Sequence, residues 1–254
     1  MTPMAYEQMA SVYDTLMEEA PYGNWVAFTK ALFSHETSEV KNVIDLGCGT
    51  GKITTGLAAS GYNMTGVDFS SAMLSQADQH AQMANVNINW ICQDLRELNI
   101  GFEMDAAVSY CDVMNYITTE KELLHVFQNT SEILKPGGLF VFDVHSLFHV
   151  EQHCINQTFA DVTDSASYIW FCLEGEEAGE MYHDLTFFKK SGDVYKKFTE
   201  LHHQRTFPVK VYKNLLKQSG FHFCHLYGDF SLKSNNVTDE TERFFIVARK
   251  QAGK

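Results

Sequence analysis

Three glycines alternate with other residues in the segment VIDLGCGTG, at positions 47, 49 and 51. A glycine has no Cβ, so the chain can turn tightly there and a ligand can lie against its main chain. Asp45 comes two residues before the first glycine, where a carboxylate at the end of a strand could accept a hydrogen bond from an ammonium group. The segment predicts a ligand-binding turn, and a purely structural strand-to-helix turn is the plainer alternative.

Two phosphate-binding patterns fit this turn poorly. A Walker A loop would need glycine at Leu46 and Ser or Thr at Ile53, although Gly51 and Lys52 match it. A dinucleotide fingerprint that starts at Gly47 would need its third glycine at Lys52. The G-x-G-x-G spacing therefore favours a ligand that brings no phosphate to the turn, and it leaves a nicotinamide oxidoreductase as a distant alternative.

Two more carboxylates follow predicted strands. Asp68 comes 21 residues after Gly47, a distance that suits a side chain holding both hydroxyls of a ribose. Asp94 ends the next predicted strand and could accept from an exocyclic amine such as that of adenine, unless it only caps the helical turn that begins at Leu95. An amino acid, a ribose and an adenine together describe S-adenosylmethionine.

The elements that must position these residues are short apolar runs that alternate with amphipathic stretches. Strands are expected within residues 42–47, 63–69, 88–94, 104–112 and 137–144, with helices that begin near Lys52, Ser70 and Thr119 and a helix stop at residues 135–138. Two helices are expected before the first strand. Such alternation predicts a parallel sheet with helices on both faces.

Residues 157–207 break this alternation. They contain three consecutive strand-like runs with Gly-containing turns, and residues 191–193 form the expected tip of a hairpin. A helix should follow Pro208 and end at Gly220, before two final runs that form an antiparallel pair. We therefore expect a helical cap over residues 1–40, a main domain over 41–145 and 207–254, and an antiparallel β insert over 146–206 that covers the acceptor site.

Four segments occur in an order that resembles the class I, Rossmann-like S-adenosylmethionine-dependent methyltransferases: VIDLGCGTG, Asp68, CQDL and LKPGGLFVFDV. The resemblance covers about residues 40–145. The segments YEQMASVYD and HHQRTF resemble, more narrowly, small bacterial methyltransferases of the YqeM-like type. The resemblance implies an α/β fold with a Rossmann-like, seven-stranded, mostly parallel sheet, helices on both faces and a small antiparallel insert after strand five.

The resemblance also implies which residues contact S-adenosylmethionine. The glycine turn would pass along its methionine part, Asp68 would bind the ribose, and Phe69 and Met73 would lie against the adenine. Tyr6 and Tyr13 share a predicted helix face that would lie over the cofactor, although both can equally be core aromatics. The expected cofactor-binding residues are Tyr6, Tyr13, Asp45, Gly47, Cys48, Gly49, Gly51, Asp68, Phe69, Met73, Asp94, Leu95, Tyr110 and Cys111.

Methyl transfer from a sulfonium is an in-line displacement that depends on alignment, and a proton acceptor helps only where the attacking atom carries a proton. The expected catalytic residues are Tyr6, Asp112 and His203, with His145 as a further candidate. His203 could instead lie on the surface of its sheet. The spacing of His145, His149 and His153 could present a metal site, but an exposed helix face explains it better and no metal is expected.

The composition of the chain limits the classes of molecule that could accept the methyl group. With 19 Lys and Arg against 32 Asp and Glu, the net charge is −13, which disfavours nucleic acid and anionic membrane partners. The four prolines, at positions 3, 21, 136 and 208, provide neither the Asp/Asn-Pro-Pro-aromatic motif nor the Pro-Cys pair of nucleic-acid methylation. We therefore expect a small-molecule acceptor, and a non-catalytic S-adenosylmethionine-binding protein as the alternative function.

The remaining features suggest a cytoplasmic protein. The first residues do not combine a basic stretch with an apolar one, and no apolar run approaches the roughly 18 residues of a membrane span. The six cysteines include no C-x-x-C pair, so free thiols are expected rather than disulfides or a zinc site. The sequence leaves the oligomeric state open.

Overall fold

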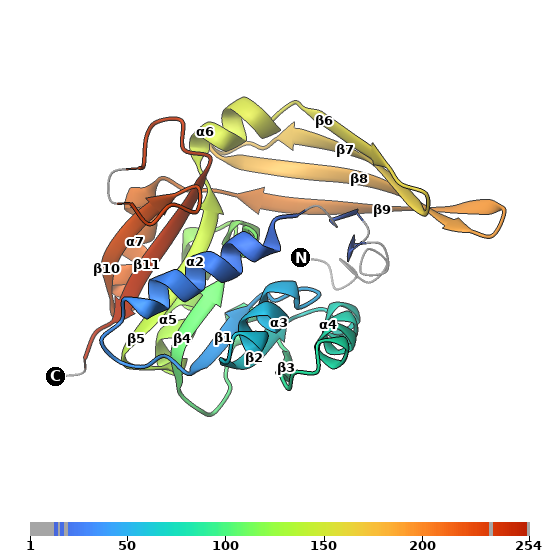
Figure 1. Ribbon diagram of the computed structural model, residues 1–254. Coiled ribbons are helices and arrows are strands. Elements are labelled where there is room, and N and C mark those ends of the chain that lie inside the picture. Colours follow the sequence, from blue (N-terminus) through green and yellow to red (C-terminus); the bar gives the residue numbers. More distant parts are fainter. Residues whose placement is uncertain (1–12, 15, 18–19, 234–235, 253–254) are drawn as a thin grey trace.

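The computed structural model describes residues 13–14, 16–17, 20–233 and 236–252. It contains a seven-stranded sheet between helices and a four-stranded antiparallel sheet that lies across one end of it (Figure 1). The strand order of the larger sheet is β10-β11-β5-β4-β1-β2-β3. Its strands are β1 (Asn42–Leu46), β2 (Asn63–Asp68), β3 (Asn89–Cys92), β4 (Met104–Ser109), β5 (Leu134–His145), β10 (Phe221–Gly228) and β11 (Arg243–Lys250).

Among the described strands of the larger sheet, only β11 runs against its neighbours, since it pairs antiparallel with both β5 and β10. The other pairs, which join β1 to β2 and β4, β2 to β3 and β4 to β5, are all parallel. The Rossmann-like, mostly parallel α/β fold and the antiparallel pair at the end of the chain are therefore confirmed.

The helices begin where the sequence predicts them. They are α2 (Tyr22–Ser34), α3 (Lys52–Ala59), α4 (Ser71–Met83), α5 (Glu120–Ile133) and α7 (Val209–Gln218). Ser70 caps α4 by accepting from the Met73 amide, and Thr119 caps α5 by accepting from the Glu122 amide. These caps satisfy amides that have no partner within the helix.

Both faces of the larger sheet are buried, and alternate strand residues belong to different clusters. Val43 packs with residues of α2 and α3 on one face, while Ile44 and Leu46 pack with residues of α5 and α7 on the other. A strand that is covered on both faces reads as a continuous apolar run. This explains why β1 and β4 were recognisable from the sequence.

The smaller sheet has one strand more than the sequence predicted. Its order is β6-β7-β8-β9, with β6 (Thr158–Val162), β7 (Ala166–Glu174), β8 (Glu180–Ser191) and β9 (Val194–Arg205). β8 and β9 form the expected hairpin with its tip at Gly192, where φ is +65°. The missed strand, β6, is five residues long and mostly exposed, so it lacks the burial pattern that marks β7 to β9.

Short helical segments connect the two sheets. After β5 the chain forms α6 (Leu147–His149) and the π-helical segment η3 (Val150–Cys154) before it enters β6. The turns after β3 and β4 contain the 3-10 helices η1 (Leu95–Glu97) and η2 (Val113–Tyr116). The two sheets do not by themselves define domain boundaries. The predicted division into a main domain over 41–145 and 207–254 and an insert over 146–206 therefore stays a prediction.

The predicted helix before α2 falls partly outside the described residues, which include Tyr13 in helical conformation but not Tyr6. In α2, the buried residues Trp25, Phe28 and Leu32 follow the predicted spacing. All six cysteines are free thiols, as expected. None of the described helices is both long and apolar enough to span a membrane.

Candidate active site

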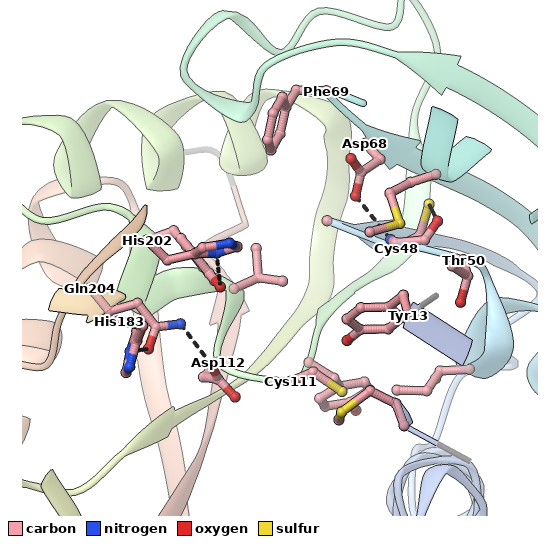
Figure 2. A pocket seen from close by; sticks show the side chains of 18 of the residues that line it. Tyr13, Cys48, Thr50, Asp68, Phe69, Cys111, Asp112, His183, His202 and Gln204 are labelled. Carbon is pink, nitrogen blue, oxygen red and sulfur yellow. Dashed lines mark hydrogen bonds between the residues drawn. The ribbon is translucent and has the colours of Figure 1, made fainter. Parts of the chain in front are cut away.

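A cavity of about 550 Å³ lies between the carboxyl ends of β1 to β4 and the inner face of the smaller sheet. Figure 2 shows the two sides of this cavity: Cys48, Thr50 and Asp68 lie across it from His183, His202 and Gln204. The residues predicted from the sequence that line it are Tyr13, Asp45, Gly47, Cys48, Gly49, Asp68, Phe69, Met73, Asp94, Leu95, Tyr110, Cys111, Asp112 and His145. Gly51 and His203 are not among the lining residues, and Tyr6 lies outside the described part of the chain.

The three glycines of the turn after β1 have different reasons to be glycine. All three have positive φ, at +78° for Gly47, +53° for Gly49 and +72° for Gly51. A Cβ at Gly51 would lie 2.8 Å from both Ala77 and Trp90, so this glycine permits close packing of the turn against α4 and β3. A Cβ at Gly49 would meet no atom within 4 Å, which leaves open space at the cavity.

Gly51 therefore corrects the sequence interpretation, which gave all three glycines to the ligand, whereas Gly47 lines the cavity and also packs against η2. A Cβ at Gly47 would lie 2.4 Å from the Val113 side chain of η2, so the turn and η2 touch there. Gly51 faces protein on the side where its Cβ would be. Of the three, Gly49 is the position at which a missing Cβ keeps the cavity open.

Asp68 holds the glycine turn in place. Its Oδ2 accepts from the Gly49 amide at 2.9 Å and its Oδ1 accepts from the Ser70 amide at 2.9 Å. The residue is 8% exposed, and burial raises the pKa of its carboxyl, while the hydrogen bonds from Ser70 and Gly49 oppose that shift. Two carboxylate oxygens offer about four acceptor sites, so this carboxylate can accept further hydrogen bonds from the cavity.

Asp45 is a second buried carboxyl group beside the turn. It is 3% exposed and accepts from the Thr54 hydroxyl of α3 at 2.6 Å. Burial raises the pKa of Asp45 to about 7. The group is thus close to half ionised at neutral pH, and a cationic ligand nearby would favour the ionised form.

Asp94 caps η1, as the plainer alternative predicted. Its carboxylate accepts from the Arg96 amide at 2.9 Å and forms an ion pair with the Arg96 guanidinium at 2.6 Å. The hydrogen bond from the Arg96 side chain lowers the pKa of Asp94. Asp94 and Leu95 also line the cavity, so capping and contact with a ligand are compatible.

The turn after β4 is strained and is held by a buried carboxylate that the sequence analysis missed. Cys111 and Asp112 are consecutive non-glycine residues with φ of +57° and +53°, a conformation that costs of order 1–3 kcal/mol for each. Asp143 on β5 accepts from both of their amides, at 3.3 and 2.8 Å. It also accepts from the Trp25 indole at 2.6 Å and pairs with Arg243 at 3.0 Å.

The sequence does contain a signal for Asp143: it is the only charged residue in the apolar segment GGLFVFDV. An aspartate inside a buried strand needs hydrogen-bond partners or a paired cation. Here Arg243 on the neighbouring strand β11 supplies the cation.

Asp112, predicted as a catalytic residue, is engaged in the same network. Its Oδ2 accepts from Gln204 at 2.9 Å, and its Oδ1 lies 3.3 Å from Arg243 and 3.4 Å from His145 Nε2. Burial alone would raise the pKa of Asp112, but the Arg243 cation and the hydrogen bond from Gln204 lower it below its ordinary value. A carboxylate of such low basicity is a poor proton acceptor.

His145 is also unsuited to the proposed catalytic role. Burial lowers the pKa of His145 to about 3, so the ring is neutral at physiological pH. It stacks on His149 with ring centroids 4.6 Å apart, and His149 and His153 lie 3.7 and 3.8 Å from Glu242. The expected exposed face is wrong for His145 and His149, which are half-buried. The described residues contain no cluster of ligands suited to a metal ion.

His203 lies on the opposite face of β9 from the cavity. It pairs with Glu180 at 2.7 Å and stacks on Tyr182, with ring centroids 4.4 Å apart. Side chains of a strand alternate between faces, so a residue adjacent to a cavity-facing one points away. The prediction of His203 was wrong by one position, since His202 and Gln204 line the cavity instead.

Residues of the smaller sheet complete the cavity, and none of them was predicted. The Trp170 indole donates to His183 Nδ1 at 2.9 Å, so the proton of the neutral ring is on Nε2, which donates to Gln204 at 2.9 Å. Gln204 in turn donates to Asp112. This chain of hydrogen bonds occupies both ring nitrogens of His183 and connects the smaller sheet to the turn after β4.

Known proteins resemble this chain in both sequence and fold. Residues 43–138 match the family described as methyltransferase domain. Over 249 residues, the chain is 39% identical to YqeM of Bacillus subtilis (strain 168), a protein whose methyltransferase name is itself provisional, and the match covers 97% of this chain and 98% of YqeM.

The chain belongs to the S-adenosylmethionine-dependent methyltransferases. A solved methyltransferase of this family from Clostridium acetobutylicum ATCC 824 superimposes with a TM-score of 0.86 at 28% identity, covering 97% of this chain and 99% of that one. The resemblance, the methyltransferase activity and the cofactor predicted from the sequence are confirmed.

The same fold occurs in a more distant methyltransferase. CalS10 from Micromonospora echinaspora, described as an S-adenosylmethionine-bound amino pentose methyltransferase, has a TM-score of 0.74 at 16% identity and covers 94% of this chain and 97% of its own. This similarity extends the shared fold to a structure described as having the cofactor bound.

Proposed function

We propose that this methyltransferase acts on a small molecule inside the cavity, by in-line transfer of the methyl group. The observation that carries the proposal is that one continuous cavity borders both the glycine turn with Asp68 and the inner face of the smaller sheet. Its volume of about 550 Å³ lies within the usual range for small-molecule sites, roughly 300–1,000 Å³.

The carboxyl ends of β1 to β3 fit the cofactor. The open position at Gly49 lets a ligand approach the main chain, and Asp68 offers acceptor sites for ribose hydroxyls. Asp45 would hold the ammonium group, directly or through water. Phe69, Met73 and Leu95 give the adenine apolar neighbours, and Asp94 would accept from its amine.

The other part of the cavity suits an acceptor that is largely apolar with a few polar groups. The residues that the smaller sheet contributes are Tyr168, Trp170, Met181, His183, Leu185, Phe187, His202 and Gln204. Aromatic and aliphatic side chains with a small number of polar groups are typical of sites that orient a small ligand. The net charge of −13 disfavours a nucleic acid as the alternative acceptor.

When bound, S-adenosylmethionine supplies a methyl group that is already activated on a sulfonium. The chain's own contribution is then to orient the acceptor and to exclude water. Holding two reactants in a near-attack arrangement can lower a barrier by about 7–11 kcal/mol. The strained turn at Cys111 and Asp112, fixed by Asp143, is a rigid element for this task at the junction of the two parts of the cavity.

The test is transfer of labelled methyl from S-adenosylmethionine into cell extract separated into small-molecule and macromolecular fractions. We expect label in the small-molecule fraction, with S-adenosylhomocysteine as a competitive inhibitor, and mass spectrometry then identifies the product. Label that enters only protein, RNA or DNA would overturn the proposal of a small acceptor.

A further inference from the structure

We propose that Glu200, His202 and Tyr116 form a proton relay in the acceptor part of the cavity, in which the Tyr116 hydroxyl takes a proton from the attacking atom of the acceptor. Tyr116 is then a catalytic residue, and His202 and Glu200 are positioning residues that act through it. This inference rests on the proposed function and adds to it a chemical class of acceptor.

The three side chains form a continuous hydrogen-bonded line. His202 Nε2 lies 2.8 Å from Glu200 Oε2, and His202 Nδ1 lies 3.1 Å from the Tyr116 hydroxyl oxygen. The side chains of His202 and Glu200 are 3% and 7% exposed, so the pair is shielded from water. Tyr116 and His202 both line the cavity, and Figure 2 shows His202 on the side opposite Asp68.

The chemistry of the groups fixes the direction of these hydrogen bonds. An ionised carboxylate can only accept, so Glu200 requires a proton on His202 Nε2. In the neutral ring, Nδ1 then has a lone pair and accepts from the Tyr116 hydroxyl. A phenol oxygen that donates one hydrogen bond can accept another at the same time. The oxygen of Tyr116 can therefore accept from a proton-bearing atom in the cavity while it donates to His202.

The proton balance of methyl transfer fits this arrangement. A bond forms between the acceptor's attacking oxygen or nitrogen and the methyl carbon as the carbon–sulfur bond breaks, and the electron pair of that bond stays on sulfur. The attacking atom gives its proton to the Tyr116 oxygen while the Tyr116 proton moves to His202 Nδ1. His202 then carries a positive charge beside the Glu200 carboxylate, which stabilises it.

The other candidate proton acceptors of the cavity are less suited. His183 uses Nδ1 to accept from Trp170 and Nε2 to donate to Gln204, and gaining a proton on Nδ1 would break the first contact. Asp112 is paired with Arg243, and His203 faces away from the cavity. In His202 the nitrogen that gains the proton already faces a hydroxyl that can supply it.

The relay predicts an acceptor whose attacking atom must lose a proton, such as an alcohol, a phenol or a protonated amine. A tertiary amine or a thiolate would have no use for it. The class follows from the chemistry of the relay and requires no particular molecule.

The first test reads the ring of His202 without any acceptor. Nitrogen NMR of the full chain, labelled with ¹⁵N at histidine and recorded across a pH series, should show that the neutral ring of His202 carries its proton on Nε2 and none on Nδ1, and the His202→Gln variant assigns the signal. A proton on Nδ1 in the neutral ring would overturn the relay, whatever the activity.

The second test uses labelled methyl transfer into the small-molecule fraction of cell extract across a pH series. Tyr116→Phe should slow transfer by about 10²–10⁴-fold. Its remaining rate should rise steadily with pH, because the acceptor must then ionise unaided. Glu200→Gln should slow transfer by about tenfold or more. All variants should bind S-adenosylhomocysteine as the unmodified chain does, since none contacts the glycine turn or Asp68.

Matched controls lie on the face of the smaller sheet that points away from the cavity. Glu180 pairs with His203 and Tyr182 stacks on it, which repeats the three residue types outside the cavity. Tyr182→Phe and Glu180→Gln should leave the rate within about twofold and the pH profile unchanged. Unchanged rate and pH profile in Tyr116→Phe would overturn the relay. If the unmodified chain methylates nothing in the extract, the proposed function fails and the NMR measurement alone decides the relay.

Discussion

Replacing Asp68 with alanine tests the binding of the cofactor most quantitatively. In the structure this carboxylate accepts from the Gly49 and Ser70 amides, each at 2.9 Å, at the border of the cavity. If it also holds the ribose hydroxyls, the variant loses these charge-assisted contacts and the fixed position of the turn. Asp68→Ala should therefore weaken binding far more than the loss of two backbone contacts alone would.

The expected magnitude follows from the contacts. A hydrogen bond to a charged group contributes about 1.5–3 kcal/mol, and water replaces part of what is lost. We expect a loss of about 2–4 kcal/mol for S-adenosylhomocysteine, or roughly 30- to 900-fold in Kd. The two backbone amides that lose their acceptor should lower the free energy of unfolding by about 1–3 kcal/mol.

Asp105 supplies the matched control. Its carboxylate accepts from the Lys41 and Asn42 amides at 3.0 and 2.8 Å, but it stands at the start of β4, at the opposite edge of the sheet. Asp105→Ala should lower the free energy of unfolding to a similar extent and leave the Kd unchanged. Titration calorimetry measures the affinity and chemical denaturation measures the stability of both variants. Equal affinity in Asp68→Ala and the unmodified chain would refute the role of Asp68 in the site.

Three further predictions concern the glycine turn, Asp45 and Asp112. Gly51→Ala should lower the free energy of unfolding by about 2–4 kcal/mol through backbone strain and contact with its neighbours, whereas Gly49→Ala should lower it by only about 1–2 kcal/mol but weaken S-adenosylhomocysteine binding at least tenfold. Thermal unfolding measures the first effect and titration calorimetry the second. The reverse pattern would contradict the assignment of Gly51 to packing and of Gly49 to the cavity. Because burial raises the pKa of Asp45 to about 7, the contribution of Asp45 to stability should be complete below pH 4 and fall as pH rises through 7. Binding of S-adenosylhomocysteine at pH 6 should release close to one proton, which calorimetry in buffers of different ionisation enthalpy should detect. Release of the same proton in Asp45→Asn would assign it to another group. Asp112→Asn should lower the free energy of unfolding by about 1–3 kcal/mol without shifting the pH profile of methyl transfer, and a shifted profile would restore Asp112 as a proton acceptor.

Much of the larger sheet could be predicted because its determinants are local. The buried strands are continuous apolar runs, and the caps at Ser70 and Thr119 lie at the predicted helix starts. The glycine turn and the aspartates at strand ends are also local features. Parallel strands bring their carboxyl ends to one edge, so the part of the cavity that borders the glycine turn followed from topology.

The part of the cavity that the smaller sheet forms could not be predicted, because it depends on which face of that sheet turns inward. His202 and His203 are adjacent and chemically identical, and only the packing of β9 over the cavity distinguishes them. Glu200 contacts His202 from the same face of β9, but the other partner of His202, Tyr116, lies far away in sequence. No local pattern connects such residues, so the sequence analysis missed this group.

The roles of single residues depended in the same way on distant partners. Gly51 follows the glycine pattern, yet the atoms that require it are in Ala77 and Trp90. Asp112 follows a strand end as a ligand-binding residue would, yet Arg243 and Gln204 occupy its carboxylate. Sequence spacing indicated where these residues lie, and the tertiary contacts decide what they do.

A crystal structure of the chain with S-adenosylhomocysteine would test the central claim directly. The account predicts the adenosyl group along the main chain at Gly49, its ribose hydroxyls on Asp68, and its sulfur facing the side of the cavity that Tyr116 and His202 line. A ligand bound elsewhere, or a cavity filled by side chains with Asp68 directed away from the ribose, would contradict it.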